Sequence, residues 1–166
     1  MKHHTISVLV ENKPGVLSRV IGVVSGRGYN IETLSVGPTL DRSCSKITML
    51  VPGDDRVLEQ VTQQLTKQID VLDVADVTRQ RHISRELLLV EIDTGDCGRT
   101  PVMELATLFG AKIVAVLPGA LTLQIAGDEQ QIHDFLRALG DFRVIDMARS
   151  GVIAVTRDNG IHESDS

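Results

Sequence analysis

The first half of the chain alternates apolar and polar residues in short runs, interrupted by runs with helical spacing. Residues 5–11 place Ile6, Val8 and Val10 on one face, which predicts a half-buried strand. A breaker at 12–15 follows, and the next apolar residues recur at the spacing of an amphipathic helix. The predicted apolar stripe of this helix is Leu17, Val20, Ile21 and Val24.

The rest of this half predicts three more strands and a second helix. The strands are expected at 30–36, 45–51 and 71–78. Asp54 or Asp55 is a suitable N-cap for the second helix. The inward residues of that helix are Leu58, Val61 and Leu65. The predicted order of elements is βαββαβ.

The same order returns about 80 residues later. Helical stripes begin near Val102 and Ile132, and Asp128 precedes the second of these helices. The predicted strands of this half cover 86–93, 111–117, 120–126, 142–149 and 152–156.

Two βαββαβ units predict an α+β protein with two tandem ferredoxin-like domains, each an antiparallel sheet with two helices on one face. The domains are expected at 1–78 and 84–157, joined by the polar segment 79–85, with a flexible tail at 158–166. Units of this size leave the second sheet face and the edge strands uncovered. We expect that face of the first unit to carry three apolar residues, Leu9, Leu34 and Leu50. Sheets should therefore meet sheets in a homo-oligomer.

Composition narrows the classes of function. The 22 acidic residues outnumber the 17 basic ones, so no basic field is available for nucleic-acid phosphates. Aromatic residues make up 2%, which leaves almost no platform for base stacking. No run of 18 or more apolar residues is present that would span a membrane. The two cysteines, Cys44 and Cys97, cannot form a disulfide framework or a four-ligand zinc site, so we expect a reducing cytoplasm.

No motif indicates catalysis or metal binding. The five histidines are scattered over unrelated segments. Cys97 precedes a predicted helix, where a thiol can become reactive, but no base is expected beside it. The neighbours Asp54 and Asp55 suit a helix cap better than an acid–base pair. The glycine-rich stretch 22–28 lies inside and after a helix, whereas a phosphate-binding loop precedes one. We therefore expect no catalytic residue and no metal site.

The loop between the first strand and the first helix is the best candidate for a ligand site. Gly15 lets the backbone approach a ligand, and the following helix N-terminus offers unpaired N–H groups that suit a carboxylate. Asn12 supplies an acceptor and two donors, as the ammonium and carboxylate of an amino acid require. Val16 and Leu17 would form an apolar wall. The alternative is purely structural: Asn12 caps the helix and Gly15 makes the turn.

A resemblance to a known family rests on two stretches of the first half. The runs VENKPGVLSRV at 10–20 and RGYNIETL at 27–34 closely resemble the opening of the small regulatory subunit of acetolactate (acetohydroxyacid) synthase. The first unit is similar to an ACT domain, a βαββαβ sensor of amino acids. The run ARSGV at 148–152 fits the same subunit, so the resemblance covers the chain apart from its last residues.

The resemblance implies a regulatory subunit without chemistry or cofactor of its own. In that family a large catalytic subunit holds thiamine diphosphate, Mg2+ and FAD. The small subunit activates it and confers feedback inhibition, typically by valine or another branched-chain amino acid. ACT domains pair side by side in a homodimer, with the effector at the interface. The site residues implied are Asn12, Gly15, Val16 and Leu17 of one chain and Asn30 and Ile31 of its partner.

Two other functions stay open on the sequence. A stand-alone ACT regulator of a different enzyme or transcription factor would share the effector site but would not bind a thiamine-dependent synthase. An enzyme on a ferredoxin-like fold would need an acid–base or nucleophile set, and the sequence shows no such set.

Overall fold

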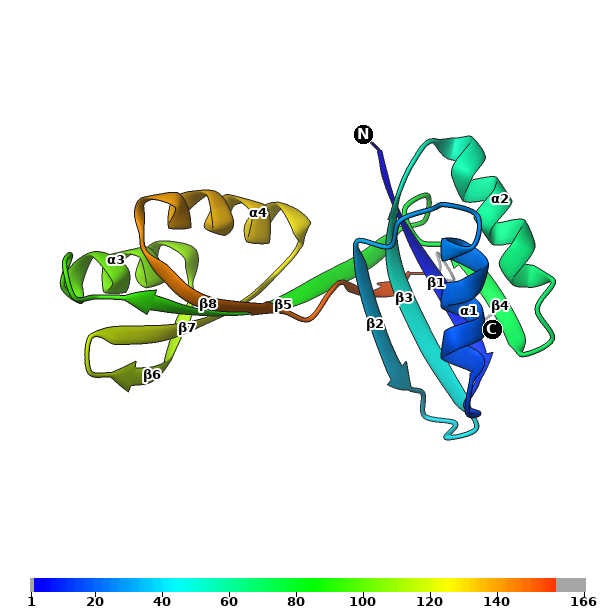
Figure 1. Ribbon diagram of the computed structural model, residues 1–166, viewed down its shortest axis with the longest axis horizontal. Helices are drawn as coiled ribbons and strands as arrows, with labels where there is room; N and C mark the ends of the chain where they lie inside the picture. The colour runs from blue at the N-terminus through cyan, green and yellow to red at the C-terminus, as the bar shows by residue number, and fades with distance from the viewer. Residues whose placement is uncertain (1, 158–166) are drawn as a thin grey trace, which may run out of the picture. The chain divides into compact units, whose positions relative to one another are not determined.

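The computed structural model describes residues 2–157, which form two compact units (Figure 1). Among the described residues, the first unit runs to Ile83 and also includes residues 154–157, whereas the second unit is Ser84–Ile153. The second unit is therefore inserted within the first along the chain. The sequence instead placed residues 154–157 in the C-terminal domain. The predicted tail at 158–166 lies outside the described residues.

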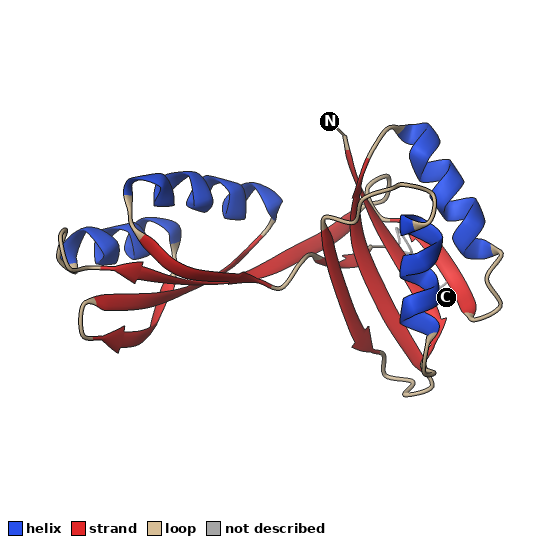
Figure 2. Ribbon diagram, viewed as in Figure 1, coloured by secondary structure: helices blue, strands red, loops and turns tan. Residues whose placement is uncertain are grey.

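The first unit is a four-stranded antiparallel sheet with two helices on one face (Figure 2). The strand order is β2-β3-β1-β4, which confirms the predicted βαββαβ arrangement. The elements are β1 (His3–Glu11), α1 (Val16–Ser25), β2 (Thr33–Pro38), β3 (Cys44–Pro52), α2 (Asp55–Thr66) and β4 (Val71–Asp76).

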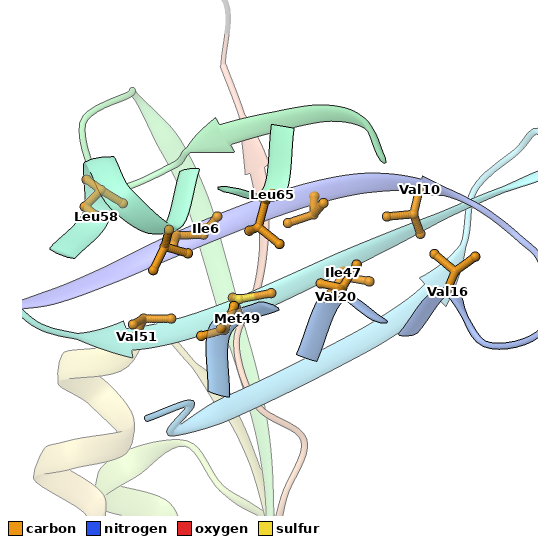
Figure 3. Packing of buried hydrophobic residues seen from close by; sticks show 12 residues of the cluster. Ile6, Val10, Val16, Val20, Ile47, Met49, Val51, Leu58 and Leu65 are labelled. Carbon is orange, nitrogen blue, oxygen red and sulfur yellow. The ribbon is translucent and has the colours of Figure 1, made fainter. Parts of the chain in front are cut away.

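An aliphatic core fills the space between this sheet and its helices. The register pairs Ile6 of β1 with Met49 of β3, and Val8 with Ile47, so these four side chains share one face. All four are fully buried. Figure 3 shows Ile6, Ile47 and Met49 among the inward side chains of the two helices. Those helix side chains include Val16, Val20, Leu58 and Leu65.

The buried stripe of α1 lies beside the predicted one. Val16, Val20 and Val24 are the buried residues of this helix, whereas Leu17 is 38% exposed and Ile21 only half-buried. Both rows are apolar, so periodicity alone does not choose between them. The orientation of α1 about its own axis decides which row faces the core, and in the structure the row of Val16, Val20 and Val24 does so.

The opposite face of the sheet carries Leu9 and Leu50 as predicted, but the prediction for Leu34 is wrong. Leu34 pairs with Met49 and packs against the core, because residues directly opposite each other in a sheet point to the same face. Leu50 itself is only 8% exposed.

The sheet face opposite the helices is also less exposed to solvent than the sequence predicted. Thr48 and Ser7 are buried there beside Leu50. Lys46, on the same face of β3, donates from Nζ to the Ala154 carbonyl oxygen at 3.1 Å. This contact joins the segment after Ile153 to the sheet of the first unit.

The second unit repeats the arrangement with the strand order β6-β7-β5-β8. Its elements are β5 (His82–Asp93), α3 (Thr100–Phe109), β6 (Lys112–Leu117), β7 (Ala120–Gly127), α4 (Glu129–Ala138), a 3-10 turn η1 (Leu139–Asp141) and β8 (Val144–Arg149). A last strand, β9 (Ile153–Thr156), pairs with β5. The predicted polar joint at 79–85 is therefore partly strand, since main-chain pairing does not depend on side-chain polarity. No helix among residues 2–157 has the length and apolar character that a bilayer crossing requires.

Caps and one buried ion pair fix the ends of these elements. Asp128 and Gln131 form a reciprocal capping box on α4, in which the Gln131 N–H donates to the Asp128 carboxylate. Glu86 is almost fully buried and accepts two hydrogen bonds from Arg149, Nε at 2.6 Å and Nη2 at 2.9 Å. This bidentate pair connects β5 to the end of β8 and neutralises the buried carboxylate.

Candidate functional site

The loop that joins β1 to α1 is fastened on the strand side. The Glu11 N–H donates to the Asp70 carbonyl oxygen at 2.9 Å. Lys13 Nζ donates to the Glu11 carboxylate at 2.6 Å, and this hydrogen bond raises the pKa of Lys13. Gly15 then takes the left-handed conformation, with φ 84°, and stands at the N-cap of α1 without a side-chain cap. Glycine adopts this conformation readily, whereas a residue with a side chain is sterically strained at positive φ.

The first turn of α1 presents free donors. Among the residues that the structure describes, the N–H groups of Gly15, Leu17 and Ser18 have no hydrogen-bond partner. They lie at the positive end of the helix dipole. A carboxylate bound at this turn would satisfy several of these donors at once.

Asn12 does not cap the helix, so the capping role that the structural alternative gave it is wrong. Its Nδ2 donates to the Arg42 carbonyl oxygen at 3.0 Å, and its main-chain N–H donates to the Ser43 carbonyl oxygen at 2.7 Å. A carbonyl oxygen only accepts, so Nδ2 must face Arg42 and Oδ1 must point elsewhere. Within residues 2–157, Asn12 Oδ1 accepts no hydrogen bond.

Only one of the two side chains of the predicted apolar wall is exposed. Val16 is 2% exposed and belongs to the core, so its side chain does not line the loop. Leu17 keeps 38% of its surface exposed and stands on the outside of the helix. Val16 therefore offers only its main chain, and Leu17 is the apolar side chain at this end of α1.

Asn30 and Ile31 lie at the other end of α1. This helix has ten residues and is about 15 Å long, so one copy does not bring the two residues to the β1–α1 loop (Figure 1). Asn30 is exposed, and Ile31 is half-buried against the core. Nearby, the Tyr29 hydroxyl donates to the side-chain oxygen of Gln60 and fastens this segment to α2.

Two groups beside the loop were missed by the sequence reasoning. Arg19 forms an ion pair with Asp70, with Nε at 2.9 Å and Nη2 at 2.5 Å from Oδ2. Its Nη1 lies 3.2 Å from where a Cβ on Gly15 would stand, so positive charge adjoins the loop. The turn at 39–43 supplies both acceptors for Asn12. Its Asp-x-Ser pattern is typical of a side-chain-stabilised turn and is the signal that was available.

The residues considered as candidates for catalysis make contacts that stabilise the local fold. Asp54 accepts from the Val57 N–H at 3.0 Å and caps α2, while Asp55 contacts Arg79 at 3.2 Å. Cys97 is exposed, and its Sγ contacts the Gly98 carbonyl oxygen at 3.3 Å. Within residues 2–157, no group of three or more His, Cys, Asp or Glu side chains is arranged to hold a metal ion.

Comparison with known proteins covers both units. Residues 6–73 match the family described as the AHAS small subunit-like ACT domain, and residues 85–158 match the family described as the small subunit of acetolactate synthase. The acetolactate synthase isozyme 3 small subunit of Salmonella typhimurium is 43% identical over 157 residues, which cover 94% of this chain and 96% of that protein. Its counterpart from Escherichia coli is 42% identical with the same coverage.

A solved structure agrees with the sequence matches. The crystal structure of the acetolactate synthase small subunit from Thermotoga maritima has a TM-score of 0.85 and 30% identity, covering 96% of this chain and 99% of that one. Both family matches, both relatives and this structure concern the small subunit of acetolactate synthase. The chain therefore belongs to the family of acetolactate synthase small subunits, the regulatory subunits of that enzyme in branched-chain amino-acid biosynthesis.

Proposed function

We propose that the β1–α1 loop binds a free branched-chain amino acid, valine first among them, and that this binding inhibits the synthase. The observation that carries the proposal is the set of free donors at the start of α1. The N–H groups of Gly15, Leu17 and Ser18 have no partner among residues 2–157, and the unused oxygen of Asn12 lies in the same loop.

Each charged end of an amino acid has a complementary group in this loop. The carboxylate would accept from the free N–H groups, where the helix dipole also favours a negative charge. The ammonium would donate to Asn12 Oδ1. Leu17 would contact the aliphatic side chain. One methylene is worth about 1–3 kcal/mol in such a contact, so valine, leucine and isoleucine would differ in affinity but share the site.

A homodimer completes the site in this proposal. Asn30 and Ile31 follow the far end of α1, a helix about 15 Å long, so they would reach the ligand from a second copy. Strand β2 is an edge of the first sheet and carries Val36, which is 46% exposed. An apolar edge strand is suited to side-by-side pairing of two sheets. The effector would then bind the paired form more tightly than the separate chains.

Inhibition follows from the difference in effector affinity between two states of the regulatory subunit. An effector shifts such an equilibrium only by that difference, and a coupling of about 1–3 kcal/mol changes activation roughly 5- to 150-fold. The thiamine diphosphate, Mg2+ and FAD belong to the catalytic subunit in this proposal, and this chain binds none of them. We place the regulatory chain in the cytoplasm with its catalytic partner.

Calorimetry with the whole chain tests the proposal. Valine, leucine or isoleucine should release or absorb heat with one site per chain or per pair of chains, and valine methyl ester should bind far more weakly because it lacks the carboxylate. Asn12→Ala should weaken valine binding while the protein stays folded. A folded, dimeric protein that gives no heat with any of the three amino acids would contradict the effector site. In the synthase assay the chain alone should form no acetolactate, and it should raise the activity of added catalytic subunit.

A further inference from the structure

The turn between β2 and β3 is braced by one carboxylate. Asp41 Oδ1 accepts from the Ser43 N–H at 2.9 Å and from the Ser43 hydroxyl at 2.6 Å. These two hydrogen bonds hold the pKa of Asp41 below its ordinary value of 3.8, so the carboxylate is charged at neutral pH. The Cys44 N–H donates to the Asp41 carbonyl oxygen at 3.0 Å and closes the turn.

This brace fixes the direction of a single peptide plane. The carbonyl of Arg42 and the N–H of Ser43 belong to one trans peptide, so they point in opposite directions. When Asp41 holds the Ser43 N–H on its own side, the Arg42 carbonyl must face the other way. On that side lies Asn12, whose Nδ2 donates to the Arg42 oxygen at 3.0 Å. Figure 1 shows the β2–β3 turn and the start of α1 at the same end of the first unit.

We propose that Asp41 is a positioning residue for the effector, acting through the Arg42 peptide on Asn12. This inference rests on the proposed effector site. The carboxylate orients the peptide, the peptide holds Nδ2 of Asn12, and Oδ1 is thereby presented to the ligand ammonium before the ligand arrives. A side chain held in its binding orientation loses less conformational freedom on binding, which increases affinity.

A double-mutant cycle on the full chain, with valine as the probe, tests this chain of contacts. Asp41→Ala should raise the valine Kd about fivefold, the effect expected for one hydrogen bond that no longer prepares the site. In an Asn12→Ala background the same change should have almost no effect, because the group that Asp41 orients is gone. Asp41→Asn keeps an oxygen that accepts from the Ser43 N–H, so it should restore most of the affinity.

Leu40 offers a matched control in the same turn. Its side chain is fully exposed, so Leu40→Ser should leave the valine Kd unchanged. If wild-type protein binds valine and Asp41→Ala binds it equally well, the positioning role is wrong. Additive losses in the cycle would also overturn it, because they would mean that Asp41 does not act through Asn12. If the wild-type protein binds no branched-chain amino acid, the proposed function itself fails, and the two failures are thereby distinct.

Discussion

Gly15→Asp is the change that bears most directly on the effector site, because it places a carboxylate where the effector's own carboxylate is proposed to lie. Two effects need to be separated. A side chain at φ 84° costs about 1 kcal/mol of folding free energy, whatever its charge. The new Cβ would stand 3.2 Å from Arg19 Nη1, the end of a flexible side chain that can move by a few tenths of an ångström.

The added charge lowers the affinity for the effector, whereas the backbone cost lowers the folding free energy. Two carboxylates about 4 Å apart repel by about 1 kcal/mol in bulk water and by about 4 kcal/mol at the effective dielectric of a protein surface. Arg19 beside the loop offsets part of this repulsion. We therefore expect valine affinity to fall about tenfold, which corresponds to about 1.4 kcal/mol within this range, and feedback inhibition to fall with it.

Gly15→Ala is the matched control, since it carries the same backbone cost without the charge. Calorimetry with valine gives the two affinities, and thermal unfolding shows whether both variants stay folded. If Gly15→Asp remains folded and binds valine as tightly as wild type, Gly15 does not adjoin the carboxylate. If Gly15→Ala loses as much affinity as Gly15→Asp, backbone conformation rather than charge explains the loss.

Three further predictions concern other parts of the chain. Asn30→Ala should weaken valine binding about 2- to 12-fold while activation of the catalytic subunit persists, and equal loss of both in the same assays would indicate a folding defect instead. Arg149→Met should lower the free energy of unfolding, measured in urea, by about 3–5 kcal/mol because it leaves the buried Glu86 carboxylate unpaired. Adding Glu86→Gln should recover part of this loss. A loss below about 1 kcal/mol for Arg149→Met would contradict the reasoning. The Arg79 hydrogen bond and Lys2 hold the pKa of Asp55 below 3.8, so its contribution to stability is complete above that pH and is lost as pH falls further. Stability measured against pH should therefore fall less steeply in acid for Asp55→Asn, and identical curves would refute the contribution.

The order of elements followed from the sequence because each segment carries its own signal. The alternation of Ile6, Val8 and Val10 is a local feature, and the structure confirms it. Capping is local as well, and of the two predicted candidates Asp54 is the residue that caps α2. The prediction that Leu34 lies on the sheet face opposite the core was wrong. A strand's inward side depends on its register with a neighbour, and no local pattern contains that register.

The candidate site was predicted only in part for a similar reason. The loop from Asn12 to Leu17 is continuous in sequence and is therefore visible as a motif. The acceptors that hold Asn12 come from a turn some thirty positions later, and their contribution is made by main-chain oxygens. Every residue type has a main-chain carbonyl oxygen, so neither composition nor spacing predicts that this one accepts from Asn12.

The return of the chain to its first unit has a consequence for synthesis. The Arg157 N–H donates to the Arg81 carbonyl oxygen at 2.7 Å, so the last described residue is bound beside the point where the second unit begins. A ribosome has made every residue of the second unit by position 153, but the first unit still lacks its closing segment at that moment. The half of the protein that emerges earliest is thus the half that is finished last, reversing the usual order in which domains mature during translation.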